Sequence, residues 1–162
     1  MRKIKNMSLD ASARESNLRD SLKKFFVDNI STTEGVPVTF DKALNAPLLQ
    51  GKEVDKWVSI TFGPVMLDTM SDVIIEIYCC TRKDNEGYKL SQLRDKVMGY
   101  LVDYNMADGK ARIDFYQSSY SGAWTLLGKL LVWEILPSGD MLAADETKFK
   151  VLTVILKVAM KI

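Results

Sequence analysis

Two pairs of carboxylates come closest, by type and spacing, to residues that could carry catalytic or metal-binding chemistry. Asp84 and Glu86 stand beside Gly87, as in part of a calcium-binding loop, but the other ligand positions of an EF-hand are absent. Asp145 and Glu146 are adjacent, and paired carboxylates can serve as a general acid and a general base. We interpret the first pair as a turn and the second as solvated charge.

Other chemistry is limited by the side chains that the sequence lacks. The chain has no histidine, which excludes the Ser-His-Asp and Cys-His arrangements and the H-E-x-x-H zinc helix. The glycine patterns of phosphate-binding and dinucleotide-binding loops are also missing. We therefore predict no catalytic, metal-binding or cofactor-binding residue, no cofactor and no enzymatic activity.

Cys79 and Cys80 are the only cysteines. Two thiols are too few for a four-ligand zinc site, and a disulfide between sequence neighbours would be strained. Their side chains should point to opposite faces of a strand and pack there as small hydrophobic groups. Two reduced cysteines favour a reducing compartment such as the cytoplasm.

Composition indicates an ordinary globular domain. The 162 residues are 47% hydrophobic and 27% charged, and 22 basic against 21 acidic residues leave a net charge of +1. A protein that binds nucleic acid over its whole surface should be far more basic. The apolar run at 151–160 is too short to span a membrane, and the basic start lacks the apolar region of a signal peptide, so we expect neither insertion nor export.

Two amphipathic helices are predicted to position the side chains described above. Ser12 and Glu15 have the spacing of a capping box, which predicts a helix over residues 12–30. The second helix is predicted over residues 88–104, and both show apolar residues at intervals of three and four. The predicted apolar stripes are Leu18, Leu22, Phe25, Phe26 and Ile30 in the first helix, and Leu90, Leu93, Val97, Leu101 and Tyr104 in the second.

Alternating and continuous apolar segments predict strands on both sides of the second helix. The expected strands cover residues 36–40, 57–62, 71–80, 111–117, 123–136 and 148–160. Pro37 should restrict the first strand to a sheet edge or a strand start, and Gly63-Pro64 should end the second. This order predicts an α+β fold (α/β sandwich), with one mostly antiparallel sheet of about six strands and both helices on one face. We expect a single domain over residues 1–162, with 1–11 as a flexible tail.

Sheet edges and one long loop are the features that suggest assembly. Unpaired edge groups must be covered, charged or used to join another chain. The connection over residues 41–56 exceeds the usual loop length and contains Leu44, Leu48 and Leu49. These leucines either fold back on the domain's own core or meet a partner, and the sequence leaves both possibilities open.

The order of elements, together with particular residues, resembles the tail-terminator (tail-completion) proteins of long, non-contractile-tailed bacteriophages. The resemblance covers Leu18 to Leu101, and later strands match only in general layout. The segments that carry it are "LRDSLKKFF", "VPVTFDKALNAP", "KWVSITFGP", "DVIIEIYCCTRKD" and, after Gly87, "LSQLRDKVMGYL".

The resemblance implies a virion protein that forms a hexameric ring on the head-proximal end of the tail tube. Such a ring stops tube polymerisation and offers a surface for head attachment. The implied partners are further copies of the chain, the tail tube protein and a head-completion or neck protein, while DNA passes through the ring without sequence-specific binding and no membrane is involved. The implied location is the virion tail, after assembly in the host cytoplasm.

Interface residues follow only as hypotheses about loops. We place Leu44, Asn45, Leu48, Leu49 and Lys52 at the contact with the tube or a neighbour, and Asp68, Thr69 and Met70 near a ring interface.

Three alternatives stay open. The chain could instead be a head-completion or neck connector protein of the phage head–tail joint, which has similar size and neutrality. It could be a small enzyme that acts through carboxylates, perhaps with a metal. It could also be a cellular interaction domain with an α+β fold.

Overall fold

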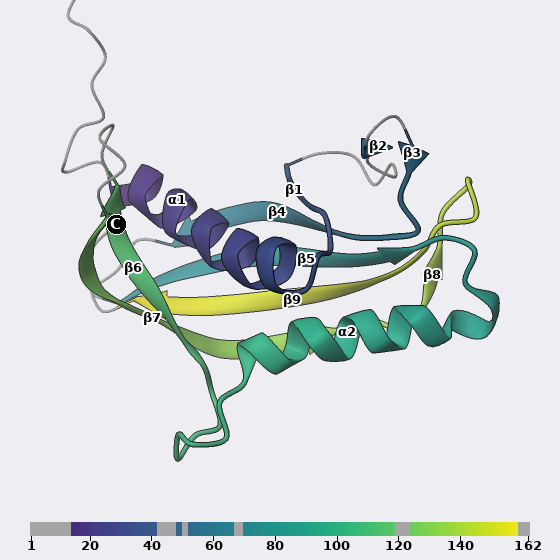
Figure 1. Ribbon diagram of the computed structural model, residues 1–162. Coiled ribbons are helices and arrows are strands. Elements are labelled where there is room, and N and C mark those ends of the chain that lie inside the picture. Colours follow the sequence, from purple (N-terminus) through teal and green to yellow (C-terminus); the bar gives the residue numbers. More distant parts are fainter. Residues whose placement is uncertain (1–13, 42–47, 50–51, 67–69, 119–123, 159–162) are drawn as a thin grey trace, which may run out of the picture.

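The structure is a computed structural model that describes residues 14–41, 48–49, 52–66, 70–118 and 124–158. It confirms the α+β fold class: a curled, mostly antiparallel sheet carries two helices (Figure 1). The elements are α1 (Arg14–Phe26), the π-helical η1 (Val27–Thr33), β1 (Val38–Phe40), β2 (Leu48–Leu49), β3 (Lys52–Glu53), β4 (Lys56–Met66), β5 (Ser71–Thr81), the 3-10 helix η2 (Asn85–Gly87), α2 (Tyr88–Leu101), β6 (Arg112–Ser118), β7 (Trp124–Pro137), β8 (Met141–Leu142) and β9 (Lys148–Val158).

The sheet is built from two pairs of strands that the last strand joins. Its order is β1-β4-β5-β9-β7-β6, with β8 beside β9. β1 runs parallel to β4 and lies at the edge, as Pro37 led us to expect, and the other pairs are antiparallel. β2 and β3 form a separate hairpin within the connection that the sequence suggested was irregular.

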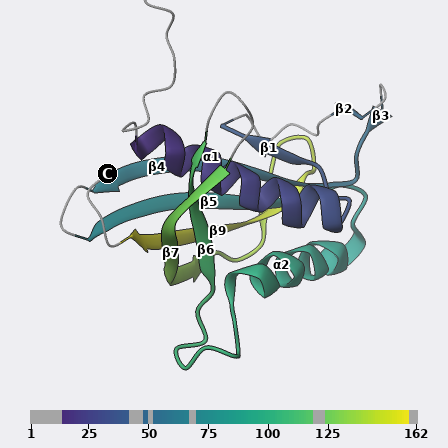
Figure 2. The ribbon, with the colours of Figure 1, turned by 60° about the vertical axis from the view of Figure 1, so that its left-hand side comes forward.

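Both helices pack on the same face of the sheet and bury their apolar stripes in one core (Figures 1 and 2). α1 and η1 contribute Leu18, Leu22, Phe26 and Ile30, and α2 contributes Leu90, Leu93, Val97 and Leu101. Opposite them stand alternate residues of β4, β5 and β9, because successive side chains of a strand point to opposite faces. Ser12, the predicted cap, lies outside the described residues.

The second helix is shorter than the sequence predicted. α2 ends at Leu101, and Tyr104 lies in the following turn with 90% of its surface exposed. Val102 is extended and bridges to Lys110, and the Asp103 N–H donates to the Gly109 carbonyl at 3.0 Å. These contacts end the helix because they bring the chain back toward β6, so Tyr104 is not part of the core.

β4 is longer than predicted because a β-bulge accommodates Gly63 and Pro64. The register with β5 shifts between Phe62 and Val65, and β4 then continues to Met66. A bulge allows one strand to carry extra residues without ending. Pro64 costs no ladder bond to β1, since β1 pairs with β4 only as far as Ile60.

The two cysteines are free and fully buried, which confirms their interpretation as packing residues. Cys79 belongs to the core under the helices, and Cys80 points to the opposite face of β5. Burial raises the pKa of both thiols to about 12.

We expect both thiols to resist alkylation in the native protein. At pH 8 a thiol of this pKa is a thiolate about 1,000-fold less often than an ordinary cysteine, and burial also excludes the reagent. Mass spectrometry after brief iodoacetamide treatment should show no adduct in native buffer and two adducts in denaturant. Rapid labelling without denaturant would contradict this burial.

Candidate functional site

The outer face of the sheet, meaning the face opposite α1 and α2, has no helix over it in the described chain (Figures 1 and 2). Its central rows pair Ile74 with Ile155, Glu76 with Thr153 and Tyr78 with Val151, and these side chains are partly exposed. Leu136 of β7 lies next to Thr153 on the same face and is half-exposed. The face therefore mixes apolar side chains with the carboxylates of Glu76 and Glu134 and with the Asp72–Lys157 ion pair.

β7 gathers exposed apolar side chains more than any other described element. Among the described residues 13 large hydrophobic side chains are exposed, and five of them lie on this one strand, which makes it a candidate contact strand. They are Trp124, Leu126, Leu127, Trp133 and Leu136. Trp133 stands at a β-bulge opposite β9, and the ammonium groups of Lys110 and Lys157 lie 4.1 and 4.5 Å from the centre of its ring.

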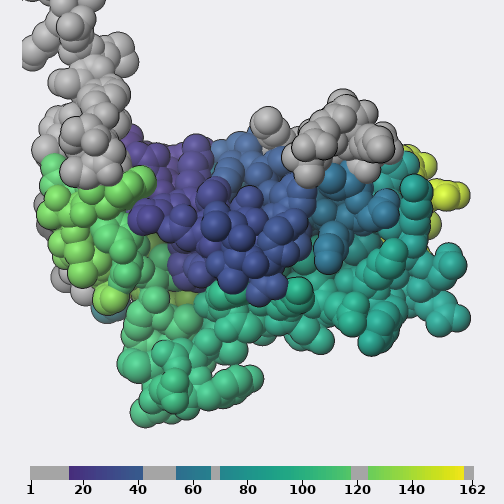
Figure 3. Space-filling view, in the orientation of Figure 1, coloured from purple at the N-terminus to yellow at the C-terminus, as the bar shows by residue number. Residues whose placement is uncertain are grey.

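The first four residues of β7 and the last three of β6 form a two-stranded ribbon, here called the β6–β7 ribbon. In the described chain β7 pairs with β9 only from Leu131 onward. In the ribbon β7 therefore pairs with β6 alone. The Trp124 ring packs edge-on against Tyr116, at 5.8 Å between ring centres. Figure 3 shows this part of β6 and β7, in green, at the surface beside the start of α1.

The ribbon has no charged residue of its own, although the ammonium group of Lys24 in α1 lies 5.4 Å from the centre of the Trp124 ring. No Asp, Glu, Lys or Arg occurs from Phe115 to Gly128, in a chain that is 27% charged. Exposed strands at the edge of a sheet ordinarily carry charges that keep other chains away. Protein interfaces show the opposite composition, with few charges and many aromatic residues at their centre. The ribbon therefore has the composition of a contact surface.

The sheet edges are less available than the sequence suggested. α1 covers the outer edge of β6, where the Ser21 hydroxyl accepts the N–H of Tyr116 at 2.8 Å and lies 3.2 Å from its carbonyl oxygen. On the other side, Asp41 accepts the N–H of Phe62 at 3.1 Å just before the bulge, and Pro64 has no N–H to offer. Strand addition at these points is blocked, which leaves faces rather than edges for contact.

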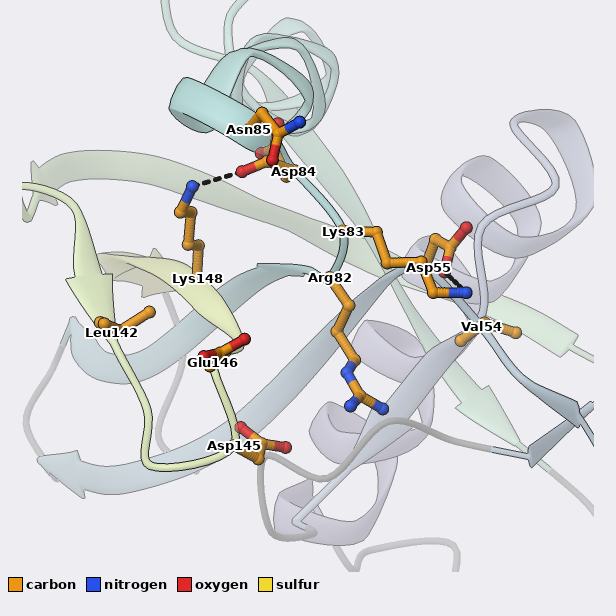
Figure 4. Close-up of a pocket in the computed structure, with 10 residues that line it drawn as sticks. All are labelled: Val54, Asp55, Arg82, Lys83, Asp84, Asn85, Leu142, Asp145, Glu146 and Lys148. Atoms are coloured by element: carbon orange, nitrogen blue, oxygen red, sulfur yellow. Dashed lines mark hydrogen bonds and ion pairs between the residues drawn. The ribbon is translucent and has the colours of Figure 1, made fainter.

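A charged pocket of about 410 Å³ lies at the opposite end of the sheet, near the start of α2 (Figure 4). It is lined by Val54, Asp55, Arg82, Lys83, Asp84, Asn85, Leu142, Asp145, Glu146 and Lys148. The fold thus brings Asp84 to the same pocket as Asp145 and Glu146, whereas Glu86 is exposed and is not one of the residues that line it. The Lys148 ammonium group donates to the main-chain oxygen of Asp84. The Nζ atom of Lys83 lies 3.9 Å from Oδ1 of Asp55.

Asp84 has a structural task in this pocket. Its carboxylate accepts the N–H groups of Lys89 and Leu90, at 3.0 and 2.9 Å, and the Thr81 hydroxyl at 3.0 Å. Burial opposes ionisation of this carboxyl, but the bonds from Leu90, Lys89 and Thr81 outweigh it and hold its pKa below the usual value. A carboxylate that stays ionised at neutral pH is a poor proton donor, and this one is engaged in holding the first turn of α2.

No protein-family model matches the chain, and no curated protein matches it significantly. Within the described residues, no group of three or more Asp, Glu or Cys side chains could hold a metal ion. None of the helices in that part of the chain is long and apolar enough to cross a membrane.

The predicted interface residues fall into two groups at opposite ends of β4. Leu48, Leu49 and Lys52 belong to the β2–β3 hairpin just before β4, in which Leu49 pairs with Lys52. Met70 lies beyond the far end of β4 and is 46% exposed, near Met66 at 58%. Leu44, Asn45, Asp68 and Thr69 lie outside the described residues.

Sequence reasoning missed the β6–β7 ribbon. The sequence predicts residues 123–136 only as a strand, and a strand that is apolar on both sides is typical of a buried one. The charge-free stretch from Phe115 to Gly128 was the signal that could have identified the ribbon as a contact surface.

Proposed function

We propose that this chain is the tail-terminator subunit of a long-tailed, non-contractile bacteriophage. In this proposal a ring of copies caps the head-proximal end of the tail tube, stops its polymerisation and offers a surface for head attachment. The observation that carries the proposal is the group of exposed apolar side chains on β7, because a monomer gains nothing from keeping such side chains in water.

The two ends of the sheet also differ in the way that a terminator requires. One end carries the uncharged β6–β7 ribbon together with the exposed Met66 and Met70, and the other carries the charged pocket beside β8. A subunit that joins a tube on one side and a head on the other needs two unlike surfaces. The resemblance of Leu18 to Leu101 to tail terminators supports the same assignment.

Electron microscopy of lysates from the source bacteriophage lacking this gene tests the proposal. We expect tail tubes that are abnormally long and not attached to filled heads, because nothing then stops addition of the tube protein. A plasmid-borne copy of the gene should restore normal length, which controls for effects on neighbouring genes.

Two other outcomes would contradict the proposal. Tails of normal length lying free beside filled heads would assign the chain to the neck of the head–tail joint instead. Intact and infectious particles would exclude a required part in virion assembly and return the enzyme and cellular-module alternatives to consideration.

A further inference from the structure

We infer that a lysine-rich pocket beside α2 binds an acidic segment of a partner protein, through side-chain carboxylates of that segment. The pocket has a volume of about 460 Å³ and lies between the start of β4 and the exposed side of α2. It is called the lysine pocket here, and it is lined by Asp55, Lys56, Lys89, Gln92, Leu93 and Lys96. It shares Asp55 with the charged pocket of Figure 4. Such a partner would meet the charged end of the sheet, and its binding does not depend on the proposed function.

Helical spacing places three of the lining residues on one side of α2. Lys89, Gln92 and Lys96 are separated by three and four positions, so they are neighbours on the helix surface, and all three are exposed. Asp55 and Lys56, at the start of β4, form the other wall. The fold thus brings three lysines from two distant segments to one hollow.

Two of the three lysines have no counter-charge of their own. In the part of the chain that the structure describes, Lys96 pairs with Glu34 at 2.9 Å, whereas no carboxylate forms an ion pair with Lys56 or Lys89. The carboxylate of the pocket itself, on Asp55, pairs with a lysine that does not line the pocket. The pocket is therefore positive although the whole chain carries a net charge of only +1. Ammonium groups that converge without carboxylates repel one another, which favours an anionic ligand as the reason for their placement.

The other lining groups favour a peptide over a phosphate chain. Leu93 is only 3% exposed and belongs to the core, so it gives the pocket an apolar floor that suits the methylene groups of a side chain. Gln92 can donate and accept hydrogen bonds and the Asp55 carboxylate can accept them, which matches the main-chain N–H and C=O groups of a peptide. A nucleic acid carries a charge on every unit and would bring some of these charges against Asp55.

The size of the pocket fits a short protruding segment. Its volume of about 460 Å³ falls within the range of roughly 300–1,000 Å³ that is usual for small-ligand sites, so it admits a few residues rather than a folded surface. Carboxylates on a loop or at a chain end can enter such a hollow, whereas the phosphates of a duplex lie on a stiff convex surface. The two unpaired lysines, Lys56 and Lys89, are the expected partners of two such carboxylates.

Fluorescence polarisation of fluorescein-labelled hexaglutamate tests the site on the purified chain. We expect saturable binding of hexaglutamate at physiological ionic strength, and no binding of labelled hexaglutamine, which has the same backbone without the charges. Lys56→Gln combined with Lys89→Gln should weaken the binding about 10-fold or more, because each substitution removes one partner of a charge pair. Both lysines are exposed, so thermal unfolding should hardly shift.

Lys24→Gln combined with Lys129→Gln is the matched control. Each double variant removes two positive charges and takes the net charge from +1 to −1, but Lys24 and Lys129 lie outside the pocket and pair with Asp28 and Asp114. The control should change the affinity less than about 2-fold. Equal weakening in the two double variants would show diffuse attraction and overturn the proposal, as would a Kd above about 1 mM for the wild type.

A labelled DNA duplex distinguishes the class of anion. We expect the duplex to bind more weakly than hexaglutamate and to respond equally to the two double variants, because it would sense only the net charge. Tighter binding of the duplex that is lost only in the Lys56→Gln and Lys89→Gln variant would assign the pocket to nucleic acid and overturn the proposal. None of these results alters the tail lengths expected without the gene, so the proposed function is tested separately.

Discussion

Gly63→Ala is expected to lower the free energy of unfolding by about 2–3 kcal/mol. A Cβ at position 63 would lie 2.7 Å from the carbonyl oxygen of Ile74 and 3.5 Å from the Ile74 Cβ. The obstacle is backbone of the neighbouring strand, which cannot rotate away as a flexible side chain could. β4 and β5 would have to separate at the bulge, where they also line the core. Urea unfolding followed by tryptophan fluorescence measures the loss.

Gly99→Ala is the matched control for this prediction. Gly99 is exposed in α2, and a Cβ there would meet nothing within 4 Å. Alanine should stabilise the protein by about 0.5–1 kcal/mol, because it lowers the entropy of the unfolded chain and favours helix. The same substitution should thus have opposite signs at the two sites. A Gly63→Ala protein as stable as the wild type would contradict the close approach of the two strands.

Asp84→Ala is expected to cost about 3 kcal/mol of unfolding free energy. The substitution removes the acceptor for the Lys89 and Leu90 N–H groups and for the Thr81 hydroxyl, and Thr81 and Leu90 are buried. Buried donors left without an acceptor carry their full desolvation cost. Asp95→Ala on the same helix is the control, since Asp95 pairs only with the adjacent Arg94 and is exposed, and it should change stability by less than about 0.5 kcal/mol.

The pH dependence of stability separates the contribution of the negative charge of Asp84 from that of its hydrogen-bond acceptors. Its pKa is lower in the folded protein than in the unfolded chain, so its contribution is fully present above the unfolded value of about 4 and is lost as the pH falls through the folded value. Asp84→Asn keeps an acceptor but cannot titrate. Urea unfolding at pH 6 and at pH 2.5 should therefore show a smaller loss of stability on acidification in Asp84→Asn than in the wild type. Equal losses in both proteins would show that the carboxylate is not preferentially ionised by the fold.

Helical periodicity located both helices and most of the core because it reports which residues share a buried face. It overran the second helix by including Tyr104, since the contacts of Val102 and Asp103 that end α2 come from residues further along the chain. Gly63 and Pro64 were read as a strand end for a similar reason. Only the neighbouring strand shows that a bulge carries β4 past them.

Strand order and contact surfaces were harder to predict. The parallel pairing of β1 with β4 and the insertion of β9 between β5 and β7 join distant segments, and no local pattern encodes them. The loop hypotheses had support only from length and composition, and they passed over β7. Met70 is exposed, and its place at a ring interface stays a prediction. Its exposure depends on where β9 first meets it, at Leu131, which is a property of the assembled sheet.

The central position of β9 makes the whole sheet depend on one late segment of the described chain, residues 148–158. The β4–β5 and β6–β7 pairs can each form as the chain leaves the ribosome, but they share no strand contact until residues 148–158 arrive between them. A prematurely terminated chain has two half-sheets with open inner edges and no continuous outer face. Such products expose unpaired strand edges and are typical substrates of chaperones and proteases. The strand order thus makes the continuous sheet conditional on the synthesis of residues 148–158.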